Sequence, residues 1–214
     1  MLKLAVLISG RGSNLQALMD ACAEPDFPAE IILVVSNKAD AYGLERAHAA
    51  NIPTAVFAAK DYGDRSDFDA AMNTAISDAG ADLVCLAGFM RLLSDGFVRA
   101  WRDRLINIHP SLLPAYKGLH VHERVIEDGA RFSGCTVHFV RPAMDEGPVI
   151  SQAVVAVHAK DTPDDLAARI LQQEHHIYPH AVKMIAEGRV RISAERVLIS
   201  DHLPPQGTLT NPDT

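Results

Sequence analysis

Short runs of apolar residues, each followed by a segment with helical spacing, recur through the first half of the chain. The runs cover residues 4–9, 31–36, 54–57 and 83–87. Runs this short and continuous are typical of strands that are buried on both faces, as in a parallel sheet. Strands that alternate with helices are joined by right-handed crossovers. The chain is therefore predicted to adopt an α/β fold, doubly wound around a mostly parallel sheet.

The segments between these runs carry helical signals. Apolar side chains at positions 15, 18, 19 and 22 share one helical face, and residues 41–50 predict a short helix. A longer helix is predicted from Asp67, with Gly80 as its C-terminal stop.

The pattern changes in the second half of the chain. Residues 121–128 predict a helix, whereas residues 135–140 and 149–157 alternate apolar and polar side chains, as antiparallel or edge strands do. Thr162 is predicted to cap a further helix with Pro163 at its first position. The inner face of this last helix would carry Leu166, Ile170 and Ile177, and a polar tail would start at Leu203.

The 214 residues contain no internal repeat and no low-complexity segment, so we expect one domain over residues 1–214. The weakest seam is residues 107–120, where the parallel pattern ends. The first apolar run is too short for a signal peptide or a membrane span. Three dispersed cysteines, Cys22, Cys85 and Cys135, favour a reducing cytoplasm over a disulfide framework or a zinc site.

The net charge of −7 and the lack of any lysine-arginine run argue against a nucleic-acid partner. Small anionic ligands remain compatible with this charge, because local groups can hold them.

Residues 105–114 read Leu-Ile-Asn-Ile-His-Pro-Ser-Leu-Leu-Pro. Asn107 and His109 would share one face of an extended segment, and Pro110 favours an extended backbone at His109. An amide can donate a hydrogen bond to a developing oxyanion, and an imidazole can carry a proton near neutral pH. The pair therefore suits chemistry at a carbonyl carbon. The alternative is a strand end with a capping asparagine and a half-buried histidine.

The loop Gly10-Arg11-Gly12-Ser13-Asn14 joins the first predicted strand to the first helix. Free N–H groups at a helix N-terminus favour a phosphate. The dinucleotide fingerprint would need a third glycine at Leu15, and the P-loop would need a Gly-Lys-Ser or Gly-Lys-Thr, so a single phosphomonoester is the better match. The alternative is a tight turn in which Ser13 caps the helix.

In an open α/β sheet, ligands bind at the carboxyl ends of the strands. The glycine loop, residues 88–93 and Asn107 with His109 could gather there around one cleft. Met90, Leu92 and Leu93 beside Arg91 suit a flat aromatic ligand, although core packing would explain the apolar residues equally well. Asp145, in a turn bounded by glycine and proline, is the best carboxylate to pair with His109.

The histidine pairs do not predict a metal site. His120 and His122 are separated by one residue and His175 and His176 are adjacent, and neither pair has metal-ligand spacing. No Gly-x-Ser-x-Gly elbow is present and no cysteine has an evident base, so covalent acyl-enzyme chemistry is disfavoured.

Four motifs together closely resemble the phosphoribosylglycinamide formyltransferase family. They are Leu-Ile-Ser-Gly-Arg-Gly-Ser-Asn-Leu-Gln at 7–16, Ser-Asn-Lys-Ala-Asp-Ala-Tyr-Gly-Leu at 36–44, Leu-Ala-Gly-Phe-Met-Arg at 86–91 and Asn-Ile-His-Pro-Ser-Leu-Leu-Pro at 107–114. The resemblance extends to about Gly207 and includes Asp145-Glu146-Gly147-Pro148-Val149-Ile150.

The resemblance implies a Rossmann-like formyltransferase fold. It also implies transfer of a formyl group from 10-formyltetrahydrofolate to the amine of 5-phosphoribosylglycinamide in purine synthesis, with no metal and no covalent enzyme intermediate. Residues 1–106 would form a phosphate-binding half, residues 107–205 a folate and catalytic half, and residues 206–214 a tail. The implied partners are these two small molecules, and the chain would be a monomer or a homodimer without nucleic acid or membrane.

The resemblance also assigns roles position by position. Asn107 would steady the formyl oxygen, His109 would handle protons and favour the oxyanion, and Asp145 would hold His109. Arg65 would lie near the glutamate tail of the folate, and Glu174 would be the main polar contact of a second ribonucleotide segment. The ribonucleotide set is Gly12, Ser13, Asn14, Leu15, Gln16, Leu171, Gln172, Gln173 and Glu174. The folate set is Arg65, Met90, Arg91, Leu92, Leu93, Asn107, Arg141, Pro142, Ala143, Met144 and Asp145.

Three other functions compete with this one. A hydrolase would deliver the formyl group of the same folate to water, and a related transferase would act on methionyl-tRNA. Both usually carry an extra domain for which this chain has no room, and the acidic charge argues against tRNA. A non-catalytic phosphate or folate binder is disfavoured because asparagine, histidine and aspartate are all present.

Overall fold

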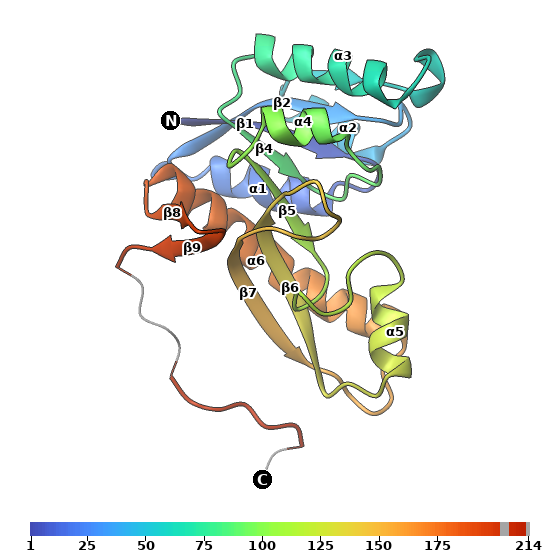
Figure 1. Cartoon of the computed structure of the whole chain (residues 1–214), viewed down its shortest axis with the longest axis vertical. Coiled ribbons are helices and arrows are strands. Elements are labelled where there is room, and N and C mark those ends of the chain that lie inside the picture. Colours follow the sequence, from blue (N-terminus) through green and yellow to red (C-terminus); the bar gives the residue numbers. More distant parts are fainter. Residues whose placement is uncertain (202–205, 213–214) are drawn as a thin grey trace.

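The computed structural model describes residues 1–201 and 206–212. Figure 1 shows a twisted mixed sheet with helices on both faces and a short hairpin near the C-terminus. The seven-stranded sheet has the order β3-β2-β1-β4-β5-β6-β7. Strands β1 to β5 pair in parallel, and β6 and β7 pair antiparallel, which confirms the predicted α/β fold.

The first half of the chain supplies the parallel strands and the helices that connect them. Its elements are β1 (Leu2–Ile8), α1 (Ser13–Cys22), β2 (Ala29–Ser36), α2 (Tyr42–Ala49), β3 (Thr54–Val56), the 3₁₀ turn η1 (Ala59–Asp61), α3 (Arg65–Asp78), β4 (Leu83–Leu86) and α4 (Asp95–Ala100).

The second half adds the last parallel strand, the antiparallel pair and the longest helix. Its elements are β5 (Leu105–His109), α5 (Val121–Glu127), β6 (Phe132–Phe139), β7 (Val149–Ala156), α6 (Pro163–Ala186) and the hairpin β8 (Val190–Ser193) with β9 (Arg196–Ile199).

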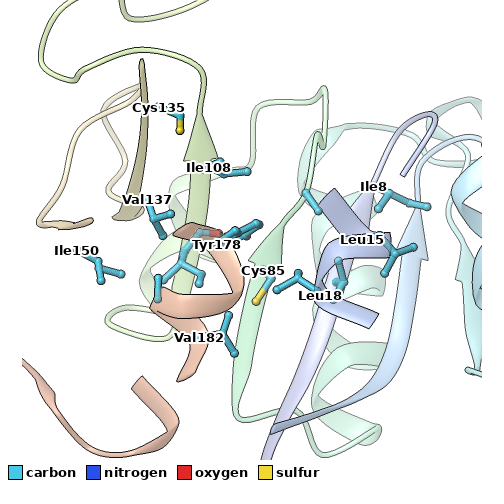
Figure 2. Close-up of a cluster of buried hydrophobic side chains, with 14 of the residues drawn as sticks. Ile8, Leu15, Leu18, Cys85, Ile108, Cys135, Val137, Ile150, Tyr178 and Val182 are labelled. Atoms are coloured by element: carbon cyan, nitrogen blue, oxygen red, sulfur yellow. Dashed lines mark hydrogen bonds between the residues drawn. The ribbon is translucent and has the colours of Figure 1, made fainter. Parts of the chain in front are cut away.

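Alternate side chains of the central strands feed two separate cores. In β1, Leu4 and Val6 pack on one face of the sheet, and Ala5 and Leu7 pack on the other. The first core is covered by α1, α2, α5 and α6, and the second by α3 and α4. Figure 2 shows the first core, where Leu15 and Leu18 of α1 and Tyr178 and Val182 of α6 pack against strand residues including Ile8, Cys85 and Ile108. Helices on both faces make the sheet doubly wound.

Strand β6 departs from the expected alternation of buried and solvated side chains. It lies between β5 and β7 and is buried on both faces, so Ser133, Thr136 and His138 are buried polar residues. Buried polar groups need partners. Thr136 finds them: its hydroxyl donates to the carbonyl of Ser111 at 2.6 Å and accepts from the N–H of Leu113 at 3.1 Å.

Helix ends follow their capping residues. Thr162 forms the predicted cap of α6, in a capping box with Asp165. Helix α3 starts at Arg65, two residues before the predicted Asp67, because Asp64 caps it by accepting from the N–H of Asp67. The inner face of α6 differs from the prediction at one position. Tyr178 is fully buried there, whereas the predicted Ile177 is only partly buried.

Helix α4 and the β8–β9 hairpin were not predicted from the sequence, because their elements are only a few residues long. The predicted start of a polar tail at Leu203 lies outside the described residues, as do residues 213–214 of the tail. Among the described helices, none combines the length and the apolar character needed to cross a bilayer.

Candidate active site

The carboxyl ends of β1, β4 and β5 lie side by side at one edge of the sheet. The register places Leu86 between Leu7 of β1 and Asn107 of β5. The glycine loop follows β1, residues 88–93 follow β4, and His109 ends β5. The N–H of Met90 donates to the Ser9 hydroxyl at 2.7 Å, which ties two of these segments together. The predicted gathering of three segments at one edge is therefore confirmed.

Asn107 and His109 project from the same face of β5, two residues apart. His109 is only 6% exposed, and its Nε2 lies 2.9 Å from the carbonyl oxygen of Tyr116. Because a carbonyl can only accept, Nε2 carries the proton of this hydrogen bond.

Asp145 faces the other nitrogen of this imidazole. Its Oδ1 lies 3.5 Å from His109 Nδ1, which is an ion-pair separation rather than a short hydrogen bond. Its Oδ2 accepts from the N–H of Gly118 at 2.7 Å. Both nitrogens of His109 therefore face acceptors, and the ring donates to both only in its doubly protonated form.

His138 belongs to the same group of side chains and was not predicted from the sequence. It lies opposite Asn107 in the β5–β6 pairing, and its Nε2 is 3.4 Å from Asn107 Nδ2. Its Nδ1 is 3.0 Å from the carbonyl of Phe139, so Nδ1 carries the proton and Nε2 is left to accept. Burial lowers the pKa of His138, which favours the neutral ring. The signal for this residue was a polar side chain facing Asn107, visible only once the strand pairing is known.

The glycine loop bends sharply into α1. Gly12, at φ 69°, is the N-cap of α1 and makes no side-chain cap, so the alternative with Ser13 as the cap is wrong. A Cβ on Gly12 would lie 2.7 Å from Gly43 Cα, so only glycine fits at this contact with α2. The first turn of α1 presents the N–H groups of Ser13, Asn14 and Leu15, which have no acceptor within a helix.

Glu174 of α6 joins the glycine loop to the second predicted ribonucleotide segment. Asn14 Nδ2 donates to Glu174 Oε2 at 2.7 Å, and both side chains are buried. Burial raises the pKa of the Glu174 carboxyl. The side-chain oxygen of Asn14, Oδ1, is buried and has no hydrogen-bond partner among the described residues. An orphaned acceptor of this kind is available to a ligand donor.

Of the remaining predicted ribonucleotide residues, Leu15 is fully buried, while Gln16 accepts from Arg46 Nη1 at 2.9 Å. Leu171 and Gln173 are half-buried and Gln172 is exposed on α6.

The segment after β4 presents apolar side chains to solvent. Met90 is 67% and Leu92 60% exposed, high values for side chains of this size. Two contacts join this segment to helix α3. Arg65 donates to the carbonyl of Leu93, and the Arg91 guanidinium lies 4.2 Å from the centroid of the Phe68 ring. In the loop between β6 and β7, Pro142, Ala143 and Met144 are likewise exposed.

Arg141 points away from this edge. Its side chain is 9% exposed and forms ion pairs with Asp103 at 2.7 Å and Glu195 at 2.6 Å. The Arg141 guanidinium is therefore already engaged by two carboxylates.

No group of three or more metal-ligating side chains occurs within residues 1–201 and 206–212. His120 lies beside Glu123 at 3.4 Å, and burial lowers the pKa of both His122 and His175.

Comparisons with known proteins agree with this geometry. The family described as "Formyl transferase" matches residues 2–182. The chain is 47% identical over 207 residues to phosphoribosylglycinamide formyltransferase of Escherichia coli (strain K12), covering 96% of this chain and 98% of that protein. It superposes on the crystal structure of glycinamide ribonucleotide transformylase 1 from Symbiobacterium toebii with a TM-score of 0.92 and 48% identity, covering 94% of this chain and 95% of that one.

Two further relatives are proteins of other kinds, a trifunctional protein and a deformylase. The chain spans about a fifth of the trifunctional purine biosynthetic protein adenosine-3 of Gallus gallus, with 47% identity over 190 residues (89% of this chain, 19% of that protein). A formyltetrahydrofolate deformylase from Pseudomonas putida KT2440 superposes with a TM-score of 0.84 and 31% identity, covering 92% of this chain and 70% of that one. The family match covers most of the chain, and the alignments with phosphoribosylglycinamide formyltransferases cover nearly all of both proteins. The chain therefore belongs to the formyl transferase family, and phosphoribosylglycinamide formyltransferases are among its relatives.

Proposed function

We propose that this chain transfers a formyl group from 10-formyltetrahydrofolate to the amine of 5-phosphoribosylglycinamide in purine synthesis, giving the N-formyl product and tetrahydrofolate. The observation that carries the proposal is the position of His109. It is held between the Tyr116 carbonyl and Asp145, on the strand next to the one that leads into residues 88–93.

The ribonucleotide binds at the glycine loop. The N–H groups at the start of α1 receive the phosphate, helped by the positive end of the helix dipole. Gly12 lets the backbone approach closely, and the orphaned oxygen of Asn14 accepts a donor of the substrate. The binding set is Gly12, Ser13, Asn14, Leu15, Gln16, Leu171, Gln172, Gln173 and Glu174.

The folate binds over the exposed apolar side chains beside β4 and β5. Met90 and Leu92 fit a flat aromatic ring system, because both are large apolar side chains exposed in the segment that follows β4. When bound, the folate supplies the activated formyl group. Its binding set is Arg65, Met90, Arg91, Leu92, Leu93, Asn107, Arg141, Pro142, Ala143, Met144 and Asp145.

Asn107, His109 and Asp145 carry the chemistry. The substrate amine attacks the formyl carbon, a new C–N bond forms, the C–N bond to the folate breaks, the amine loses one proton and the folate nitrogen gains one. Asn107 Nδ2, anchored on His138, donates to the formyl oxygen as it becomes negative. His109 stabilises the same charge and moves the proton, and Asp145 keeps its ring in place. Alignment of amine and formyl carbon removes much of the entropic barrier.

The rival function is hydrolysis, in which water replaces the amine. The likeness to a deformylase gives this rival its support. An absorbance assay of folate turnover, with and without 5-phosphoribosylglycinamide, separates the two. Turnover that requires the amine supports the transferase; turnover in water alone overturns it, and no turnover in either condition supports a non-catalytic binder.

We extend the proposal to the organisation of the chain. Residues 1–106 form the phosphate-binding half, residues 107–205 the folate and catalytic half, and residues 206–214 the tail. The partners are small molecules, since the net charge of −7 disfavours nucleic acid, and the chain acts as a monomer or homodimer. The free cysteines Cys22, Cys85 and Cys135 suit a reducing cytoplasm. Light scattering during size-exclusion chromatography distinguishes the two oligomeric states.

A further inference from the structure

The loop of residues 141–147, which carries Asp145, starts far from the histidine it serves. Val140, at the base of the loop, donates its N–H to the carbonyl of Leu105 at the amino end of β5. His109 is four residues further along β5, about 13 Å at the usual rise of a strand. Figure 1 shows the loop crossing in front of β5 to bridge this distance. The position of Asp145 therefore depends on how the base of the loop is oriented.

The base is packed tightly around the side chain of Arg141. Phe139 donates its N–H to the carbonyl of Pro148 at 2.9 Å, which closes the loop. A Cβ on Gly147 would lie 2.0 Å from the Phe139 carbonyl oxygen and 3.1 Å from Arg141 Cγ. Gly147, at φ 126°, thus lets the returning chain lie against the aliphatic stem of Arg141.

Arg141 is fixed in turn by two carboxylates from distant parts of the chain. Its Nη2 bonds to Asp103 Oδ1 at 2.7 Å and its Nε to Glu195 Oε2 at 2.6 Å, while Nη1 bonds to the carbonyl of Val140 at 3.1 Å. Asp103 precedes β5, and Glu195 lies in the turn of the β8–β9 hairpin. Charge-assisted bonds of this length are the stronger kind, and they orient the guanidinium in three directions.

The hairpin holds Glu195 in an unusual backbone conformation. Ala194 and Glu195, the two residues of the turn, have φ of 48° and 57°, the left-handed region that glycine and asparagine favour in such turns. Glu195 also pairs with Arg102, so its carboxylate bridges two arginines. The hairpin forms a sheet of its own and lies beyond residue 182, where the family match ends.

We infer that Glu195 and Arg141 are positioning residues for the proposed reaction: the β8–β9 hairpin holds the base of the Asp145 loop so that the carboxylate stays opposite His109. The inference rests on the proposed function for its kinetic consequences. A tilt of about 10° at the base would move a group 13 Å away by about 2 Å, far more than a catalytic contact tolerates. Glu195 belongs to neither binding set, and the guanidinium of Arg141 acts here through the position of Asp145 rather than through a substrate contact.

The test compares Glu195→Gln with Glu187→Gln. Glu187 is the matched control, because it pairs with Arg189 at 3.2 Å beside the same hairpin and has no link to Arg141 among the described residues. We expect Glu195→Gln to lower kcat about threefold to tenfold and to leave the KM for 5-phosphoribosylglycinamide unchanged, since the glycine loop is a separate element. Glu187→Gln should keep the wild-type kcat.

A double-mutant cycle shows whether Glu195 acts through Arg141. Arg141→Met keeps the stem and removes the charge, and adding Glu195→Gln to it should cost no further activity. Losses that instead multiply, or a Glu195→Gln variant with wild-type kcat, would overturn the inference. An inactive wild type would overturn the proposed function rather than this inference.

Hydrogen exchange gives a readout that needs no activity. We expect Glu195→Gln to speed amide exchange in the peptide that covers residues 141–147 and at Gly118, whose N–H donates to Asp145. Unchanged exchange in Glu195→Gln, or an equal rise in Glu187→Gln, would contradict the positioning role of Glu195.

Discussion

Asn107 Nδ2 lies 3.4 Å from His138 Nε2 across the β5–β6 pairing, and this contact decides which way the amide points. An amide can turn over, and only one orientation aims N–H groups at a substrate oxygen. Because His138 donates through Nδ1 to Phe139, its Nε2 can only accept, which selects the donating end of Asn107.

We predict that His138→Leu lowers kcat about tenfold with little change in either KM. The loss of the acceptor leaves the Asn107 amide without its anchor, which weakens an interaction made mainly in the transition state. Steady-state kinetics with both substrates measure the effect, and circular dichroism checks the fold. A His138→Leu enzyme with wild-type kcat would mean that Asn107 is oriented by other groups.

Asn107→Ala and His109→Ala should each lower kcat about a hundredfold to a thousandfold, the usual cost of removing a group that stabilises an oxyanion. Neither change should unfold the chain, because each shortens one side chain and leaves the pairing of β5 with β4 and β6 intact. Rates are compared at saturating concentrations of both substrates. Near-wild-type turnover in either folded variant would sink the assignment of the pair.

Gly12→Ala should destabilise the chain by about 1–3 kcal/mol, because the added methyl group would lie 2.7 Å from Gly43 Cα. Gly188→Ala is its matched control, with the same φ of 69° and no neighbour within 4 Å of the added carbon. Urea denaturation of both variants separates the contact from the backbone strain that they share. Equal losses in the two variants would show that close packing at Gly12 is unimportant.

Glu174→Gln should stabilise the fold at pH 7.5 by about 1 kcal/mol and raise the KM for 5-phosphoribosylglycinamide. Burial raises the pKa of this carboxyl, so its charged form carries a desolvation cost that a neutral amide avoids. The amide oxygen can still accept from Asn14. Thermal unfolding and substrate titration are the two measurements. A variant that loses stability at pH 7.5 would contradict the account of Glu174 as a buried charge.

The free energy of unfolding should fall as the pH drops below about 6.5. Burial lowers the pKa of His122, His138 and His175 from the ordinary value of 6.5. Below that pH these three histidines bind protons in the unfolded chain but less readily in the folded chain, so acid favours unfolding. Urea denaturation from pH 7.5 to 5.5 measures the slope. His138→Leu should flatten it, and an unchanged slope would remove His138 from the explanation.

Much of the fold was predictable because its signals are local. The apolar runs of β1, β2 and β4 and the capping box at Thr162 each lie within a few consecutive residues. Helix α4 was not predicted, since six residues with the buried pair Phe97 and Val98 show too little periodicity.

The residues of the candidate site also differ in whether their sequence signals are local. Asn107 and His109 are two residues apart, so their shared face follows from strand geometry alone. The contact of Glu195 with Arg141 spans 54 residues and depends on where a hairpin without strong sequence signals happens to fold. The place of His138 opposite Asn107 depends on the register between β5 and β6. The alternating pattern of β6 suggested antiparallel pairing but did not give this register.

The hairpin matters for anyone who shortens or fuses this chain. A boundary drawn where the family match stops, at residue 182, would keep Asn107, His109 and Asp145 and discard Glu195. It would also cut α6 before its last turn. Such a truncated protein would retain every group proposed to contact substrate, and yet the strand-to-strand loop would begin from an arginine with one carboxylate fewer to hold it.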